Sequence, residues 1–117
     1  MPKLLAAVCA GGKTHARNEA WQIVAEHPVA ADLPAKQALP QTYSDHIQLL
    51  PGPDGTVVAE AANTHLPVVL AGTVGKGRYV ACGLLVGTDA QAEEAPATGA
   101  EATLLLNAIR WSAASHP

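Results

Sequence analysis

The sequence contains no phenylalanine, and its two tryptophans and two tyrosines bring the aromatic share to only 3%. Charged residues make up 15% of the 117 residues, and the seven Lys and Arg are scattered singly. No basic stripe could neutralise a row of phosphates, which argues against nucleic-acid binding. No apolar run approaches the ~20 residues that a membrane-spanning helix needs. We therefore expect neither a nucleic acid nor a membrane as a partner.

Cysteine is scarce as well, with only Cys9 and Cys82. Two cysteines are too few for a disulfide framework or a structural zinc site. Both lie in apolar runs, which is typical of buried free thiols in a reducing compartment. The sequence therefore predicts a cytoplasmic protein with no metal and no cofactor.

Aliphatic residues and alanine make up most of the rest. The chain is 49% hydrophobic with a net charge of −3, so it can bury a core and is not a disordered polar chain. Its length favours one domain over residues 1–117. Five prolines between residues 28 and 53 indicate a long surface connection, with a short strand at 47–50.

The first part of the chain predicts two elements. The apolar run over residues 4–9 is ended by two glycines, which favours a buried strand and a turn. Residues 14–26 favour a helix because no glycine or proline interrupts them, although residues 21–24 fit a strand equally well. Residues 56–61 alternate well enough for a further strand.

The strongest strand predictions are residues 67–74 and 78–85. Both runs are rich in valine and leucine, and a Gly-Lys-Gly link between them favours a tight antiparallel hairpin. Gly72 and Gly83 fall inside these runs. Glycine within a strand marks a bulge or the close approach of another backbone.

A C-terminal helix is predicted to start near Thr98, because Thr98 and Glu101 have the spacing of a capping box. Asn107 and Arg110 are expected to face away from the core. The predicted core stripe consists of Leu104, Leu105, Ala108, Ile109 and Trp111.

Three segments, in order, resemble the C-terminal part of the trehalose-utilisation (ThuA-like) family. The first is His27-Pro28-Val29-Ala30-Ala31-Asp32-Leu33-Pro34, similar to a His-Pro-Ile-x-x-Gly-Leu-Pro segment. The second is Pro67-Val68-Val69-Leu70 running into Gly75-Lys76-Gly77-Arg78. The third is the closing Leu104-Leu105-Leu106-Asn107-Ala108-Ile109-Arg110-Trp111.

The resemblance implies a fold class. It is an α/β, three-layer, Rossmann/flavodoxin-like fold of the class I glutamine-amidotransferase-like superfamily, truncated, with an antiparallel hairpin near the C-terminal helix. Family members are roughly twice this length, so the single domain would be incomplete. A sheet left open by the missing half is a pairing hazard, so we expect a homodimer.

The resemblance also bears on function. Gly87-Thr88 stands where family members commonly have a Gly-His pair, so their chemistry is not carried over. The resemblance implies a sugar-related or ligand-binding context, and we expect a self-associating domain that is non-catalytic or binds a small, sugar-related ligand. The alternative is a small cysteine-dependent hydrolase of amidotransferase type using Cys9.

Cys9 is the candidate nucleophile for that hydrolase. It ends an apolar run before Ala10-Gly11-Gly12, which resembles a nucleophile elbow, although Ala7 stands where the elbow usually has glycine. A buried structural thiol is the competing interpretation.

A catalytic thiol also needs an imidazole base and a carboxylate that orients the base. His27 is the preferred candidate base, and His15 and His65 could serve in its place. Glu26 or Glu60 could supply the carboxylate.

The candidate ligand-binding residues are His46, Arg78 and Asp89. His46 could meet His27 across the proline-rich connection, and Asp89 lies in an acidic loop of the kind that can rim a ligand crevice. The Gly-Lys-Gly-Arg segment is not a phosphate loop, because a strand and not a helix follows it. No pair of histidines has a metal-ligand spacing.

Overall fold

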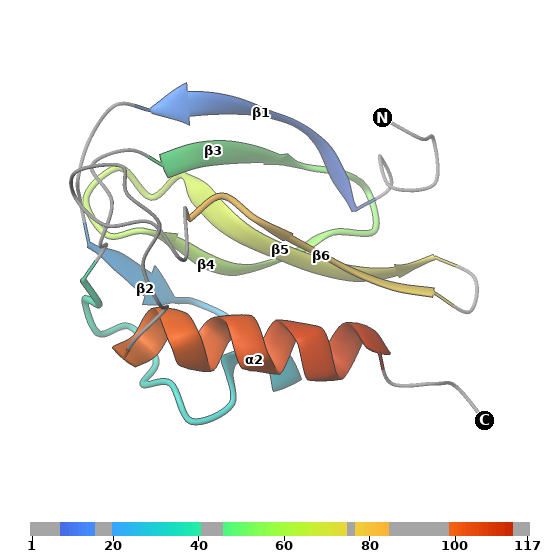
Figure 1. Cartoon of the computed structure of the whole chain (residues 1–117). Coiled ribbons are helices and arrows are strands. Elements are labelled where there is room, and N and C mark those ends of the chain that lie inside the picture. The colour runs from blue at the N-terminus through green and yellow to red at the C-terminus, as the bar shows by residue number, and fades with distance from the viewer. Residues whose placement is uncertain (1–7, 16–19, 41–45, 75–76, 85–98, 114–117) are drawn as a thin grey trace, which may run out of the picture.

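Two antiparallel sheets and one long helix make up the computed structural model, which describes residues 8–15, 20–40, 46–74, 77–84 and 99–113 (Figure 1). The two-stranded sheet joins β1 (Cys9–His15) to β3 (His46–Pro51). The four-stranded sheet has the order β2-β4-β5-β6. Its strands are β2 (Trp21–Ile23), β4 (Thr56–Ala61), β5 (Pro67–Val74) and β6 (Gly77–Cys82).

The strands predicted in the middle of the chain are confirmed. β4 and β5 have the predicted bounds, and β3 extends the predicted strand by one residue at each end. β5 and β6 form the predicted antiparallel hairpin, in register from Val69 opposite Cys82 to Val74 opposite Gly77. Val68, Val69, Leu70 and Ala71 are consecutive buried residues of β5, which is typical of a strand covered on both faces.

The predicted Rossmann/flavodoxin-like fold is wrong. Every strand pair in the two named sheets is antiparallel, and α2 (Gly99–Ala113) is the one α-helix of the described residues. A parallel sheet needs crossover connections of a dozen or more residues, usually helical. Residues 62–66 alone connect β4 to β5, which leaves no room for such a crossover.

The predicted helix over residues 14–26 is wrong for a related reason. β1 continues to His15, and residues 21–23 form the strand β2, the second of the two structures that this segment fits. Trp21 and Ile23 are buried while Gln22 between them is half-buried, which is the two-residue period of a strand. The predicted strand over residues 4–9 is also misplaced. β1 starts at Cys9 and passes through the two glycines that were expected to end it, and residues 4–7 lie outside the described residues.

The four-stranded sheet is the middle of three layers (Figure 1). The β1–β3 sheet covers one face through a cluster that includes Val8, Leu49 and Leu70. The helix α2 and the short 3-10 helix η1 (Pro28–Ala30) cover the other face. None of the described helices is long and apolar enough to cross a membrane.

The glycines inside the hairpin strands lie where other backbone comes close, as predicted. A Cβ on Gly72 would collide with the Asp54 carbonyl oxygen, and one on Gly83 would collide with the Ile47 carbonyl oxygen. These two glycines let the turn before β4 and the strand β3 pack directly on the central sheet.

The helix α2 is confirmed, but its faces differ in part from the prediction. Leu104 is buried, and Ala108 and Trp111 pack against the core, as expected. Leu105 and Ile109 are exposed, so the core stripe is narrower than predicted. Glu101 is buried in the first turn, while its predicted capping partner Thr98 lies outside the described residues.

Candidate functional site

Trp111, near the end of α2, is the centre of the best-formed group of functional side chains. Its ring lies edge-on to the His27 ring, with centroids 4.7 Å apart and an interplanar angle of 70°. The Arg78 guanidinium lies 5.3 Å from the Trp111 ring centroid, within cation–π range. Arg78 Nη1 also donates to the Trp111 carbonyl oxygen at 3.4 Å. Residues from three elements far apart in sequence therefore meet at one aromatic ring.

His27 is held in place by the start of η1. It is the N-cap residue, and its Nδ1 accepts a hydrogen bond from the Val29 amide at 3.1 Å. Pro28 follows at the first helical position, where its missing N–H leaves no donor unsatisfied. Partial burial lowers the pKa of His27 below 6.5, which favours the neutral ring that this hydrogen bond requires.

Asn107 connects α2 to the η1 segment by two hydrogen bonds. Its Nδ2 donates to the Val29 carbonyl at 3.1 Å and to the Ala31 carbonyl at 2.7 Å. The prediction that Asn107 faces away from the rest of the protein is wrong. Helical periodicity places it beside the core stripe, but the sequence carries no sign that a 3-10 helix presents two carbonyls there.

A cavity of about 530 Å³ opens beside this group. The charged residues of its described lining are Arg78, Arg110 and Asp32. Asn107 and Trp111 form part of the wall. Guanidinium groups present planar forks of donors that match carboxylate and phosphate oxygens. The cavity therefore has the chemistry of a site for a small anion.

Cys9, the predicted nucleophile, lies on the other side of the central sheet. It is 7% exposed, belongs to the cluster between the sheets, and its Sγ donates to the Gly11 carbonyl at 3.3 Å. His27 contacts Trp111, which packs against the cluster beneath α2. The structure therefore does not bring Cys9 and His27 together, because the four-stranded sheet separates them.

His15, another candidate base, is no better placed for Cys9. The two residues are the ends of β1, which puts them about 20 Å apart. A cavity of about 380 Å³ does reach Cys9, but none of the histidines whose side chains the structure describes lines it.

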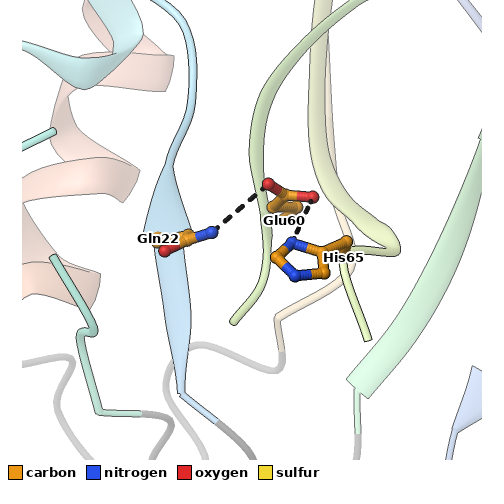
Figure 2. Close-up of polar contacts among 3 residues, drawn as sticks. All are labelled: Gln22, Glu60 and His65. Atoms are coloured by element: carbon orange, nitrogen blue, oxygen red, sulfur yellow. Dashed lines mark hydrogen bonds and ion pairs between the residues drawn. The ribbon is translucent and has the colours of Figure 1, made fainter. Parts of the chain in front are cut away.

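His65 and Glu60, a third candidate base and a candidate carboxylate, do form a pair. Figure 2 shows Glu60 between its two partners, with His65 Nδ1 3.4 Å from Glu60 Oε2 and Gln22 Nε2 donating to Glu60 Oε1 at 3.3 Å. The His65 side chain is 65% exposed and its φ is 60°, a left-handed conformation at the turn between β4 and β5. Neither cysteine joins this pair, since Cys9 donates to Gly11 and Cys82 to Leu84. The pair supports a turn and lacks a thiol.

The remaining predicted ligand-binding residues have separate fates. Arg78 lines the cavity beside Trp111. His46 is fully buried at the start of β3, opposite His15 in the β1–β3 register. Asp89 lies outside the described residues. The sequence gives no reason to select Arg110, Asn107 or Asp32, because only the packing of α2 on η1 brings them together.

Comparisons with known proteins give no family: no family model, no curated protein and no solved structure matches this chain. The described residues contain no group of three or more His, Cys, Asp or Glu side chains that could hold a metal ion. The functional argument therefore depends on the geometry of the cavity beside Trp111.

Proposed function

We propose that this chain is a non-catalytic binding domain for a small organic anion, which occupies the cavity beside Trp111. The observation that carries the proposal is the convergence of Arg78 and Arg110 on one cavity of about 530 Å³. Among the described lining residues of that cavity, the charged ones are two arginines and Asp32, whereas the whole chain carries a net charge of −3.

The fixed position of Arg78 supports the proposal. Its guanidinium is oriented by the Trp111 ring and by the Trp111 carbonyl, while Arg110 on the exposed side of α2 is less constrained. A held guanidinium loses less side-chain entropy when it binds an anion. Asn107 fixes the opposite wall through its two hydrogen bonds to the η1 segment.

Sugar phosphates are the first ligand class to test. Their phosphate suits the two guanidiniums, and Asp32 could accept a hydrogen bond from a hydroxyl. A sugar-related ligand is also what the resemblance to the trehalose-utilisation family implies, although the fold of that family is not found here. The two free cysteines support a cytoplasmic location, where such ligands are available.

Tryptophan fluorescence provides the experiment. Trp111 lines the cavity, whereas Trp21 is fully buried and donates through Nε1 to the Pro40 carbonyl, so a ligand should change the emission of Trp111 alone. We expect glucose 6-phosphate to change the emission saturably and unmodified glucose to do so only weakly. Titration calorimetry should give the same dissociation constant.

Matched charge removals sharpen this test. Arg110→Gln keeps a long polar side chain and should weaken binding of glucose 6-phosphate about tenfold, by loss of one charge-assisted contact. Lys13→Gln, on β1 away from this cavity, removes the same charge and should leave binding unchanged. Equal losses in both variants, or no saturable response to glucose 6-phosphate or inorganic phosphate, would contradict the proposal.

A further inference from the structure

The outer edge of β6 is the exposed backbone edge with the fewest safeguards in the described chain. β6 is the last strand of the four-stranded sheet, and no described strand pairs with its outer side between Gly77 and Cys82. An unpaired edge offers a row of N–H and C=O groups to any other strand, so proteins usually cover, bend or charge such edges.

The outer edges of β2 and β1 show these safeguards. At the opposite end of the same sheet, β2 has only three residues and its outer side is bridged to Leu39 and Ala35. In the two-stranded sheet, β1 carries exposed Lys13 and a bulge between Cys9 and Gly11. Short length, cover, charge and a bulge all prevent edge-to-edge pairing.

β6 lacks the short length and the bulge, and its Arg78 side chain lies against the Trp111 ring. It pairs with β5 over six consecutive positions without a register shift, and it contains no proline. Arg78 is its only charged residue, and residues 77–81 are half-buried. A long, regular and largely apolar edge of this kind is a site for the addition of a strand.

A groove accompanies this edge and supplies room for side chains on both faces. The cavity of about 380 Å³ is lined by Cys9, Tyr79 and Ala81 on the β1–β3 side and by Val80 and Ser112 on the α2 side. Alternate side chains of an added strand point to opposite faces of the sheet. A groove that passes around the edge therefore fits an extended strand better than a compact ligand.

We propose that the occupant is a second copy of this chain, whose β6 pairs antiparallel with β6 about a two-fold axis through Val80. Side chains of residues that lie opposite each other in a continuous sheet point to the same face. The two-fold axis must therefore pass between the two copies of one residue, here Val80 and Val80 of the partner subunit. This register places Arg78 opposite Cys82 of the partner subunit, so no like charges face each other.

The register also matches large residues with small ones. Tyr79 lies opposite Ala81 of the partner subunit. A Cβ on Gly77 would lie 2.7 Å from the Tyr79 hydroxyl, so the Tyr79 ring leans along its own strand toward Gly77. That leaves space beside Ala81 for Tyr79 of the partner subunit. In the alternative register, with the axis at Tyr79, the two tyrosines would lie opposite each other.

Sedimentation velocity between 1 and 200 µM, with a reductant present to exclude disulfides, tests the proposal. We expect a reversible monomer–dimer equilibrium in the wild-type chain. Cys82→Lys places a lysine opposite Arg78 twice in each dimer and should weaken dimerisation about tenfold. Cys82→Glu places the opposite charge at the same position and should strengthen dimerisation about tenfold.

Two further measurements keep the test decisive. Leu106→Lys adds the same charge to the exposed face of α2, where apolar side chains offer a rival surface, and it should leave the dimer intact. Hydrogen exchange of the wild-type chain at 5 and 200 µM should show concentration-dependent protection in β6 and none in α2, even if a variant does not fold. A monomer at all concentrations, indifference to the charge at position 82, or loss of the dimer in Leu106→Lys would overturn the proposal.

Discussion

The two faces of the central sheet are covered in different ways. On the face beneath β1 and β3, backbone approaches backbone, with Gly72 against the Asp54 carbonyl and Gly83 against the Ile47 carbonyl. On the face beneath α2, side chains make the connections, through Asn107 to η1 and through Arg78 and His27 to Trp111. At these two glycines the first face has no room for one added carbon, while the second face leaves a cavity of about 530 Å³.

The two ways of covering the central sheet suit different roles, one in specifying the fold and one in forming a site. Close packing of backbones fixes the arrangement of the two sheets, because any added atom must displace a peptide group. Side-chain hydrogen bonds and ring contacts can hold a helix in place and still leave polar groups facing a cavity. We therefore attribute fold specification to the first face, and the proposed ligand site lies on the second.

The largest expected effect comes from filling a glycine on the first face. Gly83→Ala should lower the free energy of unfolding by about 3 kcal/mol, because its Cβ would collide with the Ile47 carbonyl. Urea denaturation measures the change. Gly11→Ala is the matched control, since no atom lies within 4 Å of its added Cβ, and it should change stability by less than about 0.5 kcal/mol. Similar losses in the two variants would show that the close approach at Gly83 is not what matters.

A medium effect is expected from removing the hydrogen bonds that hold α2 to η1 on the second face. Asn107→Ala removes two hydrogen bonds to η1 and should destabilise the fold by about 1–2 kcal/mol. Because the cavity wall is no longer fixed, it should also weaken binding of glucose 6-phosphate. Ser112→Ala, on the same helix with an exposed side chain, should leave both quantities nearly unchanged.

A smaller effect is expected from the titration of His27. Burial lowers its pKa in the folded state, so the unfolded chain takes up the proton first as pH falls below 6.5. Stability is therefore fully present near pH 7.5 and declines toward pH 5. His27→Asn keeps an N-cap acceptor without a titrating ring, so its thermal melting should depend less on pH over this interval. An unchanged pH dependence in His27→Asn would assign the decline to other groups.

The two thiols test the comparison without changing stability. Cys82 is exposed by accessible area, yet protein atoms crowd its Sγ and this burial raises its pKa to about 11. The crowding decides its reactivity, because the sulfur and not the whole residue is the reacting group. At pH 8 Cys82 should react with a thiol reagent roughly one hundred times more slowly than in denaturant. Cys9, the first residue of β1, is buried between the two sheets and should label only when that face opens. Fast labelling of Cys9 in the native state would revive the cysteine-hydrolase hypothesis.

Local pattern is sufficient to predict the central strands and the C-terminal helix. Residues 67–74 form an apolar run that a short link joins to β6, and Gly72 and Gly83 mark the two close approaches. The fold class cannot be derived in this way. The resemblance implies a parallel sheet, whereas the pairings join residues as distant as Gln22 and Glu60, and no local pattern specifies them.

The candidate site is predictable in part. Arg78 and His27 are candidates from the sequence and do meet, but at Trp111, which is expected only to fill the core. Asn107 and Arg110 are predicted to face solvent because helical periodicity separates a core stripe from the rest and says nothing of a neighbouring segment such as η1. Sites built at the junction of distant elements need the tertiary structure to be seen.

The proposed ligand site on the second face is tested most directly by the amide chemical shifts of the isotopically labelled protein, which map where glucose 6-phosphate binds. The account predicts saturable shifts clustered on the second face, at Ala31, Asp32, Asn107 and Arg110, with Gln48 and Leu49 of β3 unmoved. Saturable shifts centred on the β1–β3 face, or none at millimolar ligand, would contradict it.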